Sequence, residues 1–399
     1  MSSGRLVLAV VAMLLASGVL VTATSASTSV SRPAGAPDLA AMALAVHDLP
    51  AGTRVDKQGY MRDPDYVASY TREFSIRGSP LGRSLVLGLE QTLEVERTAA
   101  EARATLGFAS RLFRGRQGAQ LLKSLIVEGG VDARDVVVRR IRTPSIGHGA
   151  LVIPIRVTVD GVAVELAVVL FRFDRVLGTL TLVGLRIRGA DTDRLARVAA
   201  SRVRAGLLPT STAAPTLSGT PQPGQVLTAT RGAWRGDQLA YAYQWERCDA
   251  AGAGCVAITG AIAPTHTVSV GDLGSTLRAR VTGRNRLGSA SATSGASPVV
   301  AGPAGAPTSA AAPVISGSVQ VGATLTATTG SWTGEPTSYA YQWRRCDAAG
   351  AGCVDIAGAT AAAYVVSSAD SRLTLRVLVV AANAAGPGGA VSAATAAVP

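Results

Sequence analysis

The chain has 399 residues, of which 48% are hydrophobic and 16% charged, with a formal net charge of +12. At roughly 100–200 residues per domain, this length predicts several domains, each able to bury its own core. The composition excludes a disordered polyelectrolyte, and four cysteines exclude a disulfide-dense miniprotein. Because no long apolar run follows the N-terminus, a polytopic membrane protein is excluded as well.

The positive charge does not favour a nucleic-acid partner. Only Lys57 and Lys123 are lysines, and the remaining basic residues are arginines spread thinly along the chain without a polybasic run. Aromatic residues that would stack on bases make up only 4% of the chain. We therefore expect no nucleic acid, and we expect the basic surface to favour anionic cell-envelope polymers.

The N-terminus has the pattern of a secretory signal peptide. Arg5 precedes an apolar run from Leu6 to Val21, and small residues follow up to Ala26. A helix of that run would measure about 24 Å, shorter than the ~30 Å hydrocarbon core, which favours cleavage near Ala26 over a permanent anchor. No cysteine follows the run, which excludes a lipoprotein. We expect export, with membrane attachment only if this segment stays uncleaved.

Residues 38–208 predict an α+β domain, an antiparallel sheet flanked by helices. Its first half has an apolar helical pattern at 38–49, a strand at 83–96, and a helix that opens with the capping box Thr98 and Glu101. Its second half predicts a helix at 119–129 and a hairpin at 149–173 that turns at Asp160-Gly161. A strand at 176–187 and a closing amphipathic helix at 191–207 follow. Asp191 or Asp193 is expected to cap the closing helix.

This domain resembles the extracytoplasmic sensor-like and lipoprotein-like domains of actinobacteria. The resemblance lies in the segment DLPAG at 48–52 and in the strand-plus-helix ending. It implies a sensor-like or ligand-binding domain.

Two sets of residues in this domain are candidates for catalysis. His148 lies in the glycine-rich segment SIGHGA, with Ser145 three residues before it, as a nucleophile and its base require. The alternative, a polar loop before a strand, is favoured. Glu90, Glu94 and Glu96 resemble a glycosidase carboxylate set, but a solvated charged strand face is favoured. The sequence has no nucleophile elbow, P-loop, dinucleotide-binding or zinc-protease motif.

The second half of the chain is a tandem repeat with a fixed period of 98 residues. The segment YAYQWERCDAAGAGCV recurs with one difference, Glu246 against Arg344, and no insertion separates the copies. A period of this length indicates two duplicated domains, because about 98 residues can close a core alone.

Each copy predicts a β-sandwich of about seven short strands separated by Gly, Pro, Asp and Ser clusters. Alternation in YAYQW places Tyr241, Tyr243 and Trp245 on one strand face, while Cys248 has the opposite parity and should point away from the core. Four tryptophans are expected in the two cores: Trp234, Trp245, Trp332 and Trp343.

The cysteines of each copy flank the glycine-rich loop DAAGAG, which can fold back as a hairpin. In an exported protein we expect the disulfides Cys248–Cys255 and Cys346–Cys353. In the chain-entropy model each stabilises its hairpin by roughly 2–3 kcal/mol. Metal binding is not expected, because the pairs lack further soft ligands.

The repeats resemble the bacterial immunoglobulin-like repeats of actinobacterial exported and surface proteins. The resemblance covers about residues 214–300 and 312–399 and rests on the Trp of GxW, the YQWxRC strand, the second Cys and the ending RVxxxNxxG. It implies a secreted or envelope-attached module without catalytic residues.

Together these patterns predict an exported, non-enzymatic, monomeric protein with binding, adhesion or spacer roles, without metal or cofactor. Its partners would be anionic envelope polymers or surface proteins. The expected divisions are a signal peptide at 1–26, an α+β domain at 38–208 and two sandwiches at 214–300 and 313–399. A Pro/Ala linker at 301–312 separates the sandwiches, which we expect to behave as separable beads. The alternative is a secreted hydrolase with its active site in residues 38–208 and the repeats as substrate tethers.

Overall fold

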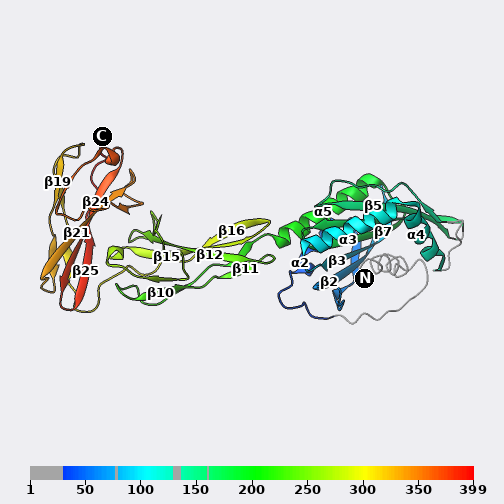
Figure 1. The fold of residues 1–399 in the computed structure, drawn as a ribbon, viewed down its shortest axis with the longest axis horizontal. Helices are drawn as coiled ribbons and strands as arrows, with labels where there is room; N and C mark the ends of the chain where they lie inside the picture. The colour runs from blue at the N-terminus through cyan, green and yellow to red at the C-terminus, as the bar shows by residue number, and fades with distance from the viewer. Residues whose placement is uncertain (1–29, 77–79, 129–135, 160) are drawn as a thin grey trace. The chain divides into compact units, whose positions relative to one another are not determined.

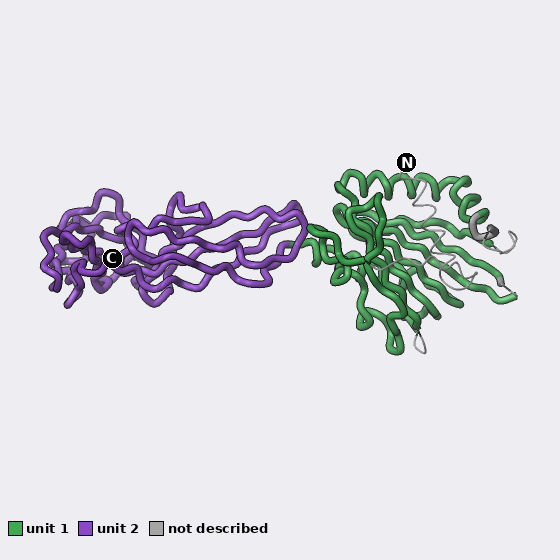
Figure 2. Tube along the Cα trace, turned by 90° about the horizontal axis from the view of Figure 1, so that it is seen from below, with its two compact units in different colours: residues 1–208 green, residues 209–399 purple. Residues whose placement is uncertain are grey.

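The computed structural model divides the chain into two compact units, Met1–Leu208 and Pro209–Pro399 (Figures 1 and 2). It describes residues 30–76, 80–128, 136–159 and 161–399. The expected signal peptide, 1–26, and the turn residue Asp160 lie outside the described residues. Within the described residues, no helix is long and apolar enough to cross a membrane.

The first unit is built on one seven-stranded antiparallel sheet with strand order β1-β2-β3-β7-β6-β5-β4. The strands are β1 (Thr53–Met61), β2 (Ala68–Ile76), β3 (Leu85–Val95), β4 (Val136–Val138), β5 (Ala150–Val159), β6 (Val162–Phe173) and β7 (Val176–Arg186). The last eight residues of β6 are buried irrespective of the face to which they point. The centre of the sheet is therefore covered on both faces, as the apolar runs of β6 and β7 require.

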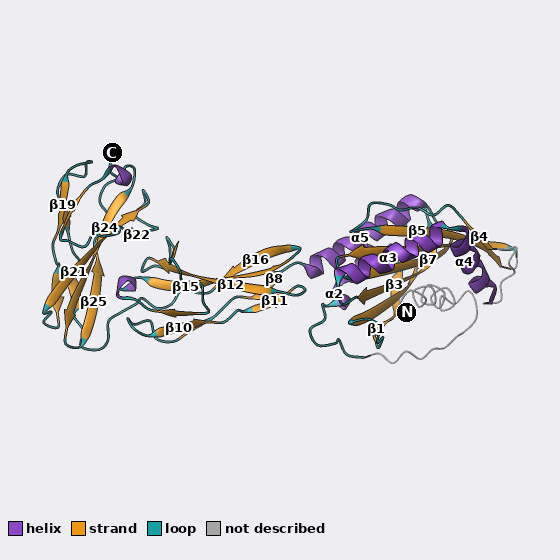
Figure 3. Ribbon diagram, in the orientation of Figure 1, coloured by secondary structure: helices purple, strands orange, loops and turns teal. Residues whose placement is uncertain are grey.

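Helices supply that cover (Figure 3). They are α2 (Leu39–Met42), the 3₁₀ turn η1 (Val46–Asp48), α3 (Ala99–Arg114), α4 (Arg116–Glu128) and α5 (Gly189–Leu207). Phe113 of α3 and Leu122 of α4 pack with Ile153 of β5 and Val168 of β6 in one core cluster. The fold class predicted for this unit, an antiparallel sheet flanked by helices, is confirmed.

Two local predictions for this unit differ from the structure. The first apolar segment forms only α2 and η1 instead of one helix. The closing helix α5 begins at Gly189, and neither aspartate caps it: Asp191 accepts a hydrogen bond from Ser84 Oγ at 2.8 Å, and Asp193 pairs with Arg142 at 2.7 Å. Both carboxylates bind other segments, which prevents them from folding back on their own helix. The capping box of α3 is confirmed.

The second unit consists of two sandwiches with the same topology, as the internal repeat predicts. In the first, the sheets are β14-β10-β9, β11-β8 and β13-β12-β15-β16; in the second they are β18-β19-β23, β17-β20 and β22-β21-β24-β25. The first sandwich has β8 (Thr210–Ala213), β9 (Leu217–Ser218), β10 (Val226–Ala229), β11 (Ala233–Arg235), β12 (Ala240–Cys248), β13 (Val256–Ala257), β14 (Thr265–Thr267), η3 (Val270–Asp272), β15 (Thr276–Asn285) and β16 (Gly288–Thr293). The second has β17 (Thr308–Ala311), β18 (Ile315–Ser316), β19 (Thr324–Ala327), β20 (Ser331–Thr333), β21 (Ser338–Cys346), β22 (Val354–Asp355), β23 (Ala363–Val365), η4 (Ser368–Asp370), β24 (Thr374–Asn383) and β25 (Gly386–Val391).

Trp245 and Trp343 form the centres of the two cores. Both are fully buried, and their indole Nε1 atoms donate to the carbonyls of Ala263 at 3.0 Å and Ala361 at 2.9 Å. The other two tryptophans, Trp234 and Trp332, are half-buried, and Trp332 packs against the core cluster of the second sandwich. Each donates its Nε1 proton to a backbone carbonyl of its own turn.

The segment between the sandwiches is partly structured. We expected a linker at 301–312, but Thr308–Ala311 forms β17 and pairs with β20. In the same way, β8 extends the first sandwich to Thr210, ahead of the expected boundary at 214. Strand pairing with the sheet edge satisfies backbone groups that an extended linker would leave to water.

Candidate functional site

The candidate pair His148 and Ser145 lies at a pocket of about 490 Å³ in the first unit. One wall is α3, and the other is the segment 143–149 that precedes β5. Polar and charged side chains from both walls and from β6 line the pocket: Arg103, Ser110, Arg114, Ser145, His148 and Arg172. We call this pocket the α3 groove.

The residues that α3 contributes to its wall of the groove are those that their spacing places on one face of the helix. Arg103, Gly107, Ser110 and Arg114 are four, three and four residues apart, so they share one face of the helix. The two arginines stand about 16 Å apart along the axis, with small residues between them. The face therefore has a positive charge at each end and a shallow centre.

The opposite wall comes close to β6 because it contains glycines. His148 N donates to Arg172 O at 2.7 Å, and a Cβ built on Gly147 would lie 2.5 Å from the same carbonyl. Gly147 also has a positive φ of 56°, which favours glycine. Gly149 would bring a Cβ within 3.2 Å of Leu106 on α3. The glycines thus fix the width of the groove.

The imidazole of His148 is held as a hydrogen-bond acceptor at one nitrogen. Its Nδ1 accepts from the backbone N–H of Asp174 at 3.1 Å, and its ring stacks on Phe173 with centroids 4.3 Å apart. The neutral ring then carries its proton on Nε2. Nδ1 is therefore not available to deprotonate Ser145, and Nε2 is a donor.

Arg172 places a buried positive charge at the base of the groove. The residue is 7% exposed, and its guanidinium donates to the carbonyls of Asp174 at 2.9 Å and of His148 at 3.0 Å. These two contacts orient the guanidinium group at the groove. The sequence analysis identified His148 and Ser145 but missed all three arginines. The spacing of Arg103 and Arg114 on the capped helix was the signal that could have found two of them.

Glu90 and Glu94 of β3, with Glu96 just after it, do not form a solvated face, which corrects the favoured prediction for them. Glu94 and Glu96 are 7% and 8% exposed. Burial, with the nearby charge of Asp63, raises the pKa of Glu94 to about 8, although a hydrogen bond with Tyr66 opposes the shift. Burial also raises the pKa of Glu96, whose Oε1 accepts from Thr105 Oγ1 on α3 at 2.9 Å.

Glu90 lies farther along the same strand. Burial, with the charge of Glu73, raises its pKa to about 7. Glu94 and Glu96 are thus buried and Glu90 is half-buried, so none of the three is fully exposed to solvent.

The predicted disulfides Cys248–Cys255 and Cys346–Cys353 are confirmed. Each closes a hairpin in which an aspartate organises the loop. Asp249 Oδ1 accepts from the backbone N–H groups of Ala251 at 2.9 Å and Ala253 at 2.8 Å. Cys248 is buried, at 3% exposure, and is not among the residues of the core cluster around Trp245.

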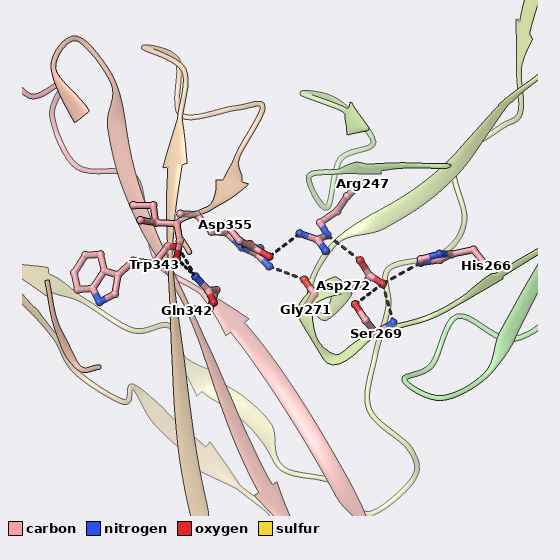
Figure 4. A network of polar contacts seen from close by, with 10 residues as sticks. Arg247, His266, Ser269, Gly271, Asp272, Gln342, Trp343 and Asp355 are labelled. Carbon is pink, nitrogen blue, oxygen red and sulfur yellow. Dashed lines mark hydrogen bonds and ion pairs between the residues drawn. The ribbon is translucent and has the colours of Figure 1, made fainter. Parts of the chain in front are cut away.

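The two sandwiches pack against each other through a polar network (Figure 4). Arg247 of the first sandwich donates to Asp272 of its own η3 at 2.8 Å and to Asp355 of the second sandwich at 3.3 Å. Arg344 of the second sandwich donates to Asp355 at 2.8 Å and to the carbonyl of Gly271 at 2.6 Å. Arg344 is the one residue that distinguishes the two YAYQW segments, and it is 3% exposed.

Apolar residues complete this junction. Leu378 of β24 is 1% exposed and belongs to the core cluster of the first sandwich, against which Val380 and Val391 also pack. Gly389 of β25 lies so near Leu273 that an added Cβ would come within 2.5 Å of it. The outer face of the second sheet therefore covers the tip of the first sandwich, which is closer packing than the expected separable beads would have.

No protein-family model and no curated protein matches the sequence. Among solved structures, the chain is similar to the extracellular domain of PknH from Mycobacterium tuberculosis, with 12% identity and a TM-score of 0.29 over 43% of this chain and 99% of that chain. It is similar to domains A168-A170 from titin, with 12% identity and a TM-score of 0.17 over 66% and 99%. It is also similar to the FN1-FN3 domains of chicken CNTN1, with 13% identity and a TM-score of 0.16 over 65% of this chain and 98% of that chain. The fold assignment rests on the strand pairing described above.

Proposed function

We propose that this chain is an exported, non-enzymatic binding protein of the cell envelope or extracellular space. In it, the two sandwiches form one joined support for the α+β domain. The observation that carries the proposal is the packing of the second sandwich on the tip of the first. The two disulfides support an oxidising, extracytoplasmic compartment.

Differences between the copies coincide with this packing. On the outer face of the long sheet, the first sandwich has Arg280 and Thr282, and the second has Leu378 and Val380 at the corresponding positions. The tips of the two sandwiches differ in the opposite sense, with Leu273 in the first copy and Ser371 in the second. Apolar residues thus occur on the face and the tip that meet, as a stable interface requires.

The charged residues of the two faces differ as well. In the first sandwich Glu246 is 1% exposed and accepts from Arg278 at 2.7 Å and from Arg280, so its charge is satisfied within its own sheet. In the second sandwich Arg344 replaces the glutamate, and Asp355 replaces Ala257. These two substitutions supply Arg344 and Asp355, two of the charged side chains in the junction.

The test replaces Leu378 by the residue that the first copy carries at the same place, Leu378→Arg. We expect this full-length variant to keep both sandwiches folded, since Arg280 occupies the same position on an intact sheet. It should lose their coupling: a single calorimetric transition of the second unit should separate into two. Protease should also cut faster between residues 301 and 307.

Thr282→Arg is the matched control, because it adds the same bulk and charge to the outer face of the first sandwich. It should leave the coupling unchanged. If Leu378→Arg and the wild type melt and digest alike, the two sandwiches are independent and the joined-support proposal fails.

A further inference from the structure

We propose that the α3 groove binds a polyanionic, hydroxyl-rich oligomer, one whose acid groups are carboxylates or phosphodiesters. This inference concerns the first unit and does not depend on the support role of the sandwiches. It follows from the charges of the groove, their separation and the groups between them.

The charges on α3 are available to a ligand. Arg103 and Arg114 are exposed, and neither makes an ion pair with any residue that the structure describes. The pocket of about 450 Å³ at the sandwich junction is different, because its Arg247 and Arg344 are held by Asp272 and Asp355. Guanidinium groups are suited to bidentate bonds with carboxylate or phosphate oxygens.

The separation of the charges selects a ligand with several acid groups. Arg103 and Arg114 emerge about 16 Å apart along the helix, while Arg172 lies between α3 and the opposite wall. A single carboxylate or phosphate cannot engage both ends of α3. An oligomer that follows the helix presents one acid group to each end.

The centre of the groove suits hydroxyl groups. Ser110, Thr143 and Ser145 line it, with hydroxyls that both donate and accept, and His148 carries its neutral-ring proton on Nε2. Among the described residues that line the groove there is no Phe, Tyr or Trp on which a nucleobase would stack. These groups favour a hydroxylated polymer over a nucleic acid.

The experiment titrates the full-length protein by calorimetry at low salt with four probes. They are α-1,4-tetragalacturonate, a glycerol-phosphate tetramer, neutral maltotetraose and tetrathymidylate. We expect at least one of the two acidic, hydroxyl-rich probes to bind and maltotetraose not to bind. The tighter of the two acidic probes identifies the acid group that the groove prefers.

Arg103→Gln and Arg114→Gln should each weaken binding by roughly tenfold or more, because each removes a charge-assisted contact. Arg197→Gln, on the exposed side of α5, is the matched control and should bind within about twofold of the wild type. Raising the salt concentration should weaken binding of the wild type more than that of either groove variant.

Three results would overturn the proposal. The first is no binding of either acidic probe. The second is binding that survives both groove substitutions or is lost equally in Arg197→Gln. The third is binding of tetrathymidylate as tight as that of the acidic oligomers, which would indicate a site for polyanions in general. A normal result for Leu378→Arg alongside any of these would leave the sandwich support intact.

Discussion

Asp272 is the residue on which the tip of the first sandwich depends. Its side chain is fully buried, and it accepts from Ser269 N at 2.8 Å, Ser269 Oγ at 2.9 Å and Arg247 Nε at 2.8 Å. Burial alone would raise the pKa of Asp272, but the hydrogen bonds from His266 and Ser269 and the charge of Arg247 outweigh it. The pKa is held well below its usual range, so the native state favours the carboxylate.

We therefore expect Asp272→Asn to lower the free energy of unfolding of the second unit by about 2 kcal/mol at pH 7. Because the native pKa lies below the unfolded value, the stabilisation by Asp272 is complete above about pH 4 and is lost as the pH falls through the native pKa. The difference between variant and wild type should shrink as the pH is lowered from 4. Urea titrations at several pH values measure it.

Asp370→Asn provides the parallel measurement in the second sandwich, where Ser367 and Arg345 hold the carboxylate in the same way. Its pKa is also lowered. A gap between Asp272→Asn and wild type that stays constant from pH 7 to pH 3 would contradict the role assigned to the ionised carboxylate.

At the scale of the element, Trp245 of β12 and the disulfide-closed hairpin that follows it contribute differently to the free energy of unfolding of the first sandwich. Trp245 fills the centre of its core, whereas Cys248–Cys255 closes a short loop at the end of β12. Trp245→Ala should cost about 3–5 kcal/mol, because it leaves a large cavity. Replacing both cysteines by serine should cost less, about 2–3 kcal/mol.

Thermal unfolding of the full-length protein measures both variants. The same pair of changes in the second sandwich, Trp343→Ala against Cys346→Ser with Cys353→Ser, repeats the comparison. A disulfide-free variant that unfolds below the tryptophan variant would show that the hairpin, not the core, limits the stability of the sandwich.

The sequence was sufficient for features that neighbouring residues determine. The disulfides follow from a short glycine-rich loop, the start of α3 follows from its capping box, and the burial of Trp245 follows from strand alternation. The start of α5 was mispredicted because Asp191 bonds to Ser84, more than one hundred residues away. The α3 groove was missed for a related reason, since only the sheet order brings segment 143–149 to α3.

The junction between the sandwiches belongs to the scale of the whole molecule. The sequence carries its signal, but only in the positions where the copies differ, such as Arg280 against Leu378. Similarity between the copies predicts what each one builds alone. The positions at which the copies differ indicate where one copy packs against the other. The alternation of residues within a single strand carries no information about such a partner domain.

Removing that partner should change the behaviour of the second sandwich. Residues 301–399 expressed alone would expose Leu378, Val380 and Val391 on one sheet face. We expect this fragment to unfold at a lower temperature than in the full chain, or to self-associate at high concentration. Residues 209–300 expose mainly Leu273 and should remain monomeric. Calorimetry and sedimentation velocity measure both, and a monomeric second fragment with an unchanged melting temperature would contradict the coupling.

The unequal tip residues have a consequence for how the gene can change. Two stretches with an uninterrupted 98-residue period are a substrate for misaligned recombination, which adds or deletes one copy at a time. An added copy of the second type would set its apolar face against a tip carrying Ser371 and Arg372 instead of Leu273 and Gly274. Such a product would place Ser371 where the existing junction buries Leu273, and Arg372 where it has Gly274. We therefore expect a further copy of the second type to pack less stably on its neighbour than the second sandwich packs on the first.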